Sequence, residues 1–220
     1  IKAGFLKPFS QENTTEQDRT TALYRHLSQQ ETVEPIDYAT LTKQLNNGET
    51  DDLLEEAVSL HRQIAKKHDI IIVEGLVPNS RDAFVSELNA SLAQALDAKV
   101  LFISNADINK PCQTAEKVEA QLRHFGGAFS TRTIGVLFMR TRGLPENSAL
   151  IPVTMDPSLR LVDETHKFTS DIQKTHTQIG TAQFPVVGLV PFSDTLSVPR
   201  VSDLASQIQA TWINEGKSKL

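Results

Sequence analysis

The ten-residue stretch Ile70–Asn79, IIIVEGLVPN, restricts the fold of this chain more than any other segment. Its first four residues are all β-branched and predict a β-strand buried on both faces, as in an internal parallel strand. The strand ends at Glu74, and Gly75 opens a loop. Because open parallel sheets bind ligands at the carboxyl ends of their strands, Glu74 is a candidate ligand-binding residue.

Predicted strands and helices alternate along the rest of the sequence. Further strands are predicted at Ala3–Lys7, Val100–Ser104, Thr133–Arg140 and Phe184–Phe192, and helices at Asp18–Leu27, Asp37–Leu45, Asp51–Lys67, Asp82–Leu96, Thr114–Phe125, Leu161–Thr175 and Val201–Ile213. Strands joined through helices form right-handed crossovers and a parallel sheet with helices on both faces. We therefore predict an α/β fold, with a mostly parallel sheet in a three-layer α/β/α arrangement, and a single domain over residues 1–220.

The most regular helical pattern lies within Asp51–Lys67. Residues at helical spacing form an apolar stripe that predicts its buried face: Leu54, Ala57, Val58, His61 and Ala65. His61 on this stripe is interpreted as a semi-buried histidine rather than as a metal ligand. The paired glycines of FGGAF, Phe125–Phe129, predict a helix end rather than a phosphate-binding loop, because a helix precedes them and a strand follows.

The composition excludes several classes of function. With 220 residues, a net charge of −5 and 39% hydrophobic residues, the chain is typical of a soluble protein, not of one that binds nucleic acid or anionic membranes. Its single cysteine, Cys112, excludes an internal disulfide framework and a cysteine-based zinc site. No apolar run approaches the roughly 20 residues of a membrane span, and no signal peptide is visible, so we expect a cytoplasmic protein.

Three charged residues at or near the predicted edge where the strands end could form a ligand site. Lys7 ends the first predicted strand, Asp18 follows the next loop, and Glu74 ends the second strand. A lysine would bind a phosphate as a point charge, and the two carboxylates would supply oxygen ligands to magnesium. The alternative, that polar residues simply occur where strands end, stays open. The sequence contains no G-x-x-x-x-G-K-[ST], G-x-G-x-x-G or G-x-S-x-G motif, and we assign no catalytic residue.

Seven segments in a fixed order carry a resemblance to a known family. They are GFLKPFSQ, DRTT, IIIVEGLVPN, LNASLAQALDAKVLFISN, IGVLFMR, FPVVGLVPF and ATWINEG, and together they cover nearly the whole chain. In this order they resemble the dethiobiotin-synthetase-like, P-loop-type region at the amino terminus of long bacterial phosphate acetyltransferases. That region is similar to the ATP-binding fold of dethiobiotin synthetase and cobyrinic acid diamide synthase.

The resemblance implies roles for four residues. Lys7 matches the lysine of the KP turn near substrate and phosphate, and Asp18 and Glu74 match the two acids that bind magnesium. With Gly75, they would form a remnant nucleotide or phosphate site. Two departures weaken a catalytic role: Leu76-Val77-Pro78 replaces a glycine-rich loop, and Met139 stands where dethiobiotin synthetases have an adenine-reading asparagine.

The family also implies a place within a longer protein. Its P-loop follows a first strand, and both are expected upstream of Ile1, so the chain is expected to be a piece of a longer polypeptide. We predict a regulatory and oligomerisation domain of a phosphate acetyltransferase, the enzyme that interconverts acetyl-CoA plus phosphate and acetyl phosphate plus CoA. Two alternatives stay open: an active ATP- and Mg-dependent ligase of the dethiobiotin synthetase or cobyrinic acid diamide synthase type, and a partitioning or scaffold ATPase with a nucleotide-binding fold. Expected partners are the protein's own carboxyl-terminal acetyltransferase domain, further copies in a homo-oligomer, and a small-metabolite effector; nucleic acid and membrane are not expected.

Overall fold

The computed structural model describes residues 1–11, 18–79, 83–128, 130–143, 160–176 and 178–193, together with Ala205 and Ala210. The chain divides into two compact units. The first contains Ile1–Leu101 and Lys117–Ile134, and the second contains Phe102–Glu116 and Gly135–Leu220. This division does not test the single-domain assignment for residues 1–220, which stays a prediction.

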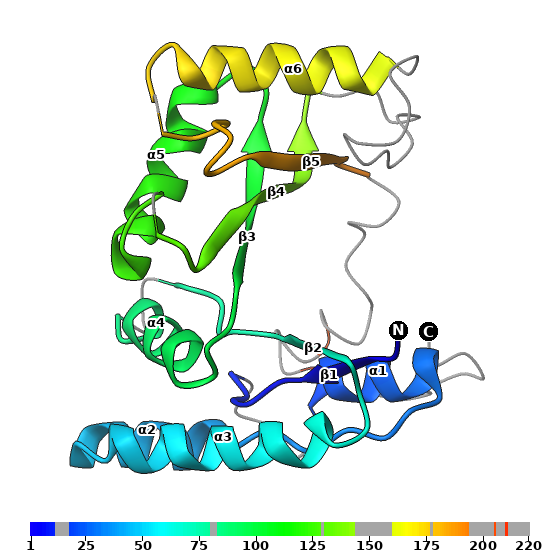
Figure 1. Cartoon of the computed structure of the whole chain (residues 1–220), viewed down its shortest axis with the longest axis vertical. Coiled ribbons are helices and arrows are strands. Elements are labelled where there is room, and N and C mark those ends of the chain that lie inside the picture. The colour runs from blue at the N-terminus through cyan, green and yellow to red at the C-terminus, as the bar shows by residue number, and fades with distance from the viewer. Residues whose placement is uncertain are drawn as a thin grey trace. The chain divides into compact units, whose positions relative to one another are not determined.

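The first unit is built around two parallel strands, β1 (Ala3–Leu6) and β2 (Ile70–Val73). Their register pairs Ala3 with Ile70 and Leu6 with Val73, so both strands end at the same edge of the sheet. The helices of this unit are α1 (Arg19–Ser28), α2 (Tyr38–Asn47), α3 (Thr50–Ala65) and α4 (Val85–Ala95), with a short 3-10 helix, η1 (Arg123–Phe125). In Figure 1, α2 and α3 run side by side beneath the strands, and these two helices contact each other.

The helix ends follow the capping residues of the sequence. Asp18 and Asp37 begin α1 and α2, and each side chain accepts a hydrogen bond from the backbone N–H three residues later. Gly48 ends α2 with φ +78°, and Gly126 ends η1 with φ +85°. Both glycines adopt the left-handed conformation that closes helices, and Gly126 thereby confirms that FGGAF terminates a helix.

The second sheet has the strand order β3-β4-β5. Its strands are β3 (Val100–Asp107), β4 (Thr133–Arg142) and β5 (Val186–Pro191), and its associated helices are α5 (Pro111–Leu122) and α6 (Arg160–Gln173). β4 and β5 are parallel. Hydrogen bonds from Val100 to Arg132 and from Ile108 to Arg142 advance in the same direction along β3 and β4, as parallel pairing requires. The predicted α/β class with parallel strands is confirmed.

Two predicted burial patterns are wrong. β2 was predicted to be buried on both faces, but Ile70 and Ile72 are 53% and 61% exposed. Among the described strands, β2 pairs only with β1. β3, also predicted to be a buried strand, likewise exposes Leu101 and Ile103.

The buried face of α3 also differs from the predicted stripe. Leu53, Ala57 and Ile64 are the buried residues, whereas Ala65 is exposed and Leu54, Val58 and His61 are only partly buried. Apolar residues spaced by three and four positions occur on more than one face of this helix. Packing against the hydrophobic core determines which of these faces is buried. Burial lowers the pKa of His61, which fits its interpretation as a semi-buried histidine. The predicted helix Val201–Ile213 lies outside the described residues, apart from Ala205 and Ala210.

Candidate functional site

Three of the predicted site residues meet at the carboxyl ends of β1 and β2. The Lys7 Nζ atom lies 2.8 Å from Asp18 Oδ2 and 3.6 Å from Glu74 Oε1. The side chains of Lys7 and Asp18 are 10% and 2% exposed, and that of Glu74 is 33% exposed. We call Lys7, Asp18 and Glu74 the buried ion cluster. The structure thus brings together residues separated by 67 positions in the sequence.

The local fold explains why these side chains converge. Leu6 pairs with Val73 in the parallel register, so the next residues, Lys7 and Glu74, leave the sheet side by side. The backbone N–H of Glu74 donates to Leu6 O at 2.8 Å and extends this pairing by one residue. Asp18 reaches the same edge because it is the capping residue at the amino terminus of α1.

Neighbouring hydroxyl and amide groups complete the cluster. Ser10 Oγ donates to Asp18 Oδ2 at 3.1 Å, and the Thr21 N–H donates to Asp18 Oδ1 at 3.0 Å. Thr20 Oγ1 donates to Glu74 Oε1 at 3.4 Å. Sequence reasoning did not assign Ser10 or Thr20 to the site, although Ser10 lies in GFLKPFSQ and Thr20 in DRTT, both of which mark the resemblance.

The cluster keeps Asp18 ionised. Burial by itself raises the pKa of Asp18, but the hydrogen bond from Lys7, the backbone hydrogen bond from Thr21 and the charge of Lys7 outweigh this effect. The pKa of Asp18 is therefore lowered below its usual value of 3.8. The ionised Asp18 and the Lys7 ammonium form a buried pair, which needs the additional hydrogen bonds to offset the loss of water.

The arrangement fits an ammonium better than a magnesium ion. Both oxygens of Asp18 already accept hydrogen bonds, and the Lys7 ammonium lies within 3.6 Å of both carboxylates. Magnesium requires oxygen ligands in octahedral geometry, and a lysine in contact with both acids opposes it by charge. No group of three or more His, Cys, Asp or Glu side chains suited to a metal occurs among the residues described. The magnesium assignment to Asp18 and Glu74 stays a prediction, and we derive no chemical step from it.

The fourth predicted site residue, Gly75, lies where a loop packs closely on α4. A Cβ atom at Gly75 would lie 2.9 Å from Asn89 Oδ1. The side-chain amide of Asn89 binds both backbone groups of Leu76, the residue after Gly75. Its Oδ1 accepts a hydrogen bond from Leu76 N at 2.9 Å, and its Nδ2 donates one to Leu76 O at 2.8 Å. Gln11 holds Val77 in the same way, through its Nε2 and Oε1. Two side-chain amides therefore fix the loop after the strand, and the packing explains the glycine without a ligand.

Met139, the residue at the expected adenine position, lies near the carboxyl end of β4 and is followed by Arg140. It belongs to the second unit, and the buried ion cluster belongs to the first. The absence of an adenine-reading amide at this position is a property of the sequence and stays an argument against dethiobiotin chemistry.

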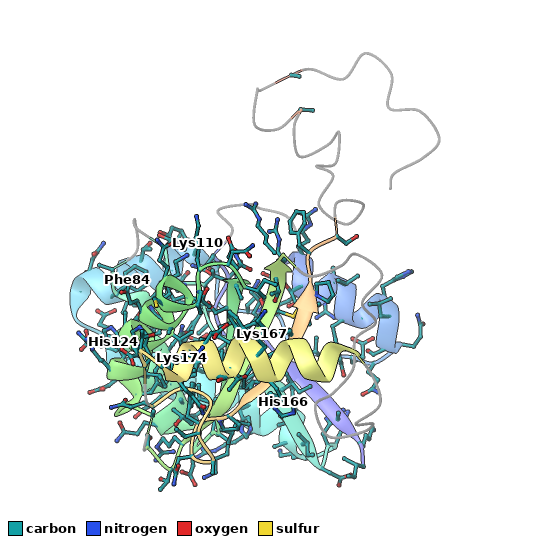
Figure 2. All side chains as sticks on the ribbon, turned by 90° about the horizontal axis from the view of Figure 1, so that it is seen from above. Phe84, Lys110, His124, His166, Lys167 and Lys174 are labelled. Carbon is teal, nitrogen blue, oxygen red and sulfur yellow. The ribbon has the colours of Figure 1, made fainter. Side chains whose placement is uncertain are left out.

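An open hollow of about 430 Å³ lies on the first unit, away from the buried ion cluster. It is lined by Glu87, Ala90, Ser91, Gln94, His124, Phe125, Gly126, Ser130 and Arg132. His124 lies on η1 and is exposed; it is labelled in Figure 2. Arg132 is already paired with Asp97 at 2.7 Å. The hollow shares no residue with the predicted site.

None of the helices that the structure describes is both long and apolar enough to cross a membrane.

Comparison with known proteins places these features in a family. The family model described as AAA domain matches residues 1–200. A phosphate acetyltransferase of Acinetobacter baylyi is 58% identical over 219 residues, which is 100% of this chain and 30% of that protein. Those of Escherichia coli and Nitrosomonas europaea are 30% and 28% identical and cover 98% and 100% of the chain. The chain spans about 30% of the length of these curated relatives.

The match covers the two parallel sheets, the connecting helices and the buried ion cluster. Parallel strands joined through helices are consistent with the predicted three-layer α/β/α fold of the P-loop type. The chain therefore belongs to the AAA-domain family of P-loop-type proteins and corresponds to the amino-terminal domain of the longer phosphate acetyltransferases that it resembles.

Proposed function

We propose that this chain is a regulatory and oligomerisation domain of a phosphate acetyltransferase and is not itself catalytic. The whole enzyme would interconvert acetyl-CoA plus phosphate and acetyl phosphate plus CoA through its carboxyl-terminal domain. In this proposal the protein is cytoplasmic, and its partners are that domain, further copies of itself and a small metabolite.

The observation that carries the proposal is the internal neutralisation of Lys7. In an active phosphate site the lysine ammonium is available to the ligand, as a point charge on an oxygen. Here Lys7 is buried and contacts two carboxylates, which outnumber it in charge. A phosphate that approaches this cluster without a bound cation would meet net negative charge. The cluster therefore supports a remnant site at Lys7, Asp18, Glu74 and Gly75 rather than an active one.

The exposed faces of the strands support a role in assembly. Ile70 and Ile72 on β2 are more than half exposed, and apolar residues of this size are usually covered in a complete protein. The relatives are more than three times as long as this chain, so further protein is available to cover them. The expected first strand with its P-loop is one such segment. The described strands form two sheets rather than one closed sheet, so this expectation stays a prediction.

Calorimetric titration of the full-length polypeptide with ATP and Mg²⁺ tests whether the segment has lost its nucleotide chemistry. We expect no binding with a micromolar dissociation constant. Magnesium-dependent micromolar binding that disappears in Glu74→Gln would contradict the proposal and favour an ATP-dependent ligase.

The same Glu74→Gln protein tests the regulatory half of the proposal. We expect its maximal rate of acetyl transfer to stay within about twofold of the unmodified protein. Its mass in light scattering or the shape of its substrate saturation curve should change. Loss of the maximal rate together with unchanged assembly and saturation would show that the segment acts in the chemistry itself.

A further inference from the structure

Two arginines and a phenylalanine meet at the carboxyl ends of β4 and β5. The guanidinium carbons of Arg140 and Arg142 each lie 5.4 Å from the centroid of the Phe192 ring. Both arginines are exposed, and Phe192 is partly buried. We call these three residues the arginine–phenylalanine cluster. It lies within the second unit, at the sheet edge where parallel α/β proteins bind ligands.

The backbone beneath the cluster is irregular. Phe138 pairs with Leu189 and Thr141 with Pro191, so two residues of β4 lie opposite one residue of β5. The register shifts here by one residue, as in a β-bulge, and such irregularities next to binding sites commonly re-aim a side chain. Arg140, the second of the two residues of β4, has φ +49°, a left-handed conformation that is uncommon for residues other than glycine. Such strained backbone conformations persist only where the surrounding structure holds them, and they are concentrated at functional sites.

Hydrogen bonds on both sides hold this backbone in place. The Phe192 N–H donates to Thr141 O at 3.0 Å, and the Ile108 N–H donates to Arg142 O at 3.1 Å. Thr141 itself is fully buried, and its Oγ1 donates to Phe138 O at 3.3 Å. The two arginines are therefore carried by a strand that is fixed to both neighbours, which is a suitable base for a precise binding site.

The cluster carries positive charge that the described residues do not neutralise. Because both guanidinium carbons contact one ring, they lie within about 11 Å of each other. No carboxylate of the described residues forms an ion pair with either of them, whereas Arg25 pairs with Glu34 and Arg132 with Asp97. Two like charges at this separation repel one another. An anion bound between them would attract both and so replace this repulsion with a favourable electrostatic energy.

We propose that the arginine–phenylalanine cluster binds a small molecule with two oxyanion groups, each contacted by one guanidinium, and with the atoms that link these groups against the Phe192 ring. Guanidinium groups bind carboxylates and phosphates through two parallel hydrogen bonds, and an aromatic ring attracts guanidinium groups that lie over its face. This inference rests on the proposed function, since the cluster would be the metabolite site of the regulatory domain.

Calorimetry on the full-length polypeptide at low ionic strength tests the proposal with two probes, pyrophosphate and succinate. We expect at least one probe to bind, and the double variant Arg140→Gln/Arg142→Gln to weaken that binding at least tenfold. Binding of pyrophosphate alone assigns a phosphate-type ligand, and binding of succinate a dicarboxylate. Phe192→Leu should weaken binding less than the double variant does, because it removes the stacking surface and keeps both charges.

Arg132→Gln is the matched control, because Arg132 is a partly exposed arginine of the first unit that pairs with Asp97. It should leave probe binding unchanged. Equal binding by the unmodified protein and the double variant, or equal losses in the double variant and in Arg132→Gln, would overturn the proposal. If the double variant melts at a lower temperature by circular dichroism, the single variant Arg142→Lys tests the proposal instead. This variant keeps the charge but loses the planar guanidinium donor, so we expect weaker probe binding. Unchanged binding by Arg142→Lys would also overturn the proposal.

Acetyl transfer measured with and without the bound probe separates this site from the proposed function. Arginine-dependent binding that leaves acetyl transfer unchanged would support the site and overturn the regulatory role. A change in acetyl transfer that persists in Arg140→Gln/Arg142→Gln would support the regulatory role and overturn this site.

Discussion

The two strand-end clusters occupy equivalent positions in their sheets but differ in whether their positive charges are paired with acids. The buried ion cluster closes on itself, with Lys7 between Asp18 and Glu74 and neighbouring hydroxyl and amide groups on the carboxylates. The arginine–phenylalanine cluster exposes two guanidiniums on one ring with no described acid between them. The position of a cluster at a sheet edge therefore indicates where a ligand could bind. Its charge balance indicates whether protein groups already neutralise the charges or leave them for a ligand.

The largest expected difference between the clusters is in stability. Lys7→Met would leave the ionised Asp18 buried without its cation, and breaking a buried ion pair typically costs about 3–5 kcal/mol. We expect a loss of about 3 kcal/mol in the free energy of unfolding, measured by urea denaturation. Arg142→Gln, in the exposed cluster, should change it by less than about 0.5 kcal/mol. Similar losses in the free energy of unfolding for the two variants would contradict the difference between the clusters. Lys174→Ala, which removes an exposed ion pair, provides a second control with little expected effect.

A smaller effect is expected at the loop beside the buried ion cluster. Gly75→Ala would place a methyl group against Asn89 Oδ1, and overpacking of this kind costs about 1–3 kcal/mol. Asn89→Ala alone should also destabilise the protein, because it removes both hydrogen bonds to Leu76. The double variant should cost less than the two single losses together, since Asn89 is the group with which the methyl collides. Strictly additive losses in urea denaturation would show that Gly75 is needed for another reason.

The smallest expected effect concerns pH. Because the pKa of folded Asp18 lies below its usual value of 3.8, the cluster contributes stability above pH about 4 that is lost as the pH falls through the folded pKa. Asp18→Asn should therefore flatten the acid side of the stability profile, followed by thermal melting between pH 2 and 7. Asp37→Asn offers a comparison, since hydrogen bonds from Thr40 lower the pKa of Asp37 at an exposed position. An equal flattening in both variants would mean that burial beside Lys7 adds nothing.

Much of the local structure could be predicted from the sequence. The predicted helix starts at Asp18 and Asp37, the predicted helix end at FGGAF and the apolar strand Ile70–Val73 all lie close to where short-range patterns indicated. The meeting of Lys7, Asp18 and Glu74 followed from the rule that parallel strands end at one edge. The hydrogen bonds of Asn89 and Gln11 to the loop backbone could not be predicted. The sequence around an amide side chain does not indicate which distant residue it binds.

The sequence by itself determined the alternation of strands and helices, the class of fold and the set of charged residues at the strand ends, because these depend on interactions between near neighbours. Only the tertiary structure decided that Ile70 and Ile72 stay exposed, that Leu53 rather than Leu54 faces the core, and that Lys7 is neutralised by two acids. It also decided that the register shift at Arg140 brings two arginines to Phe192. Burial and charge pairing depend on residues that are distant in the chain, and these become neighbours only when the strands align.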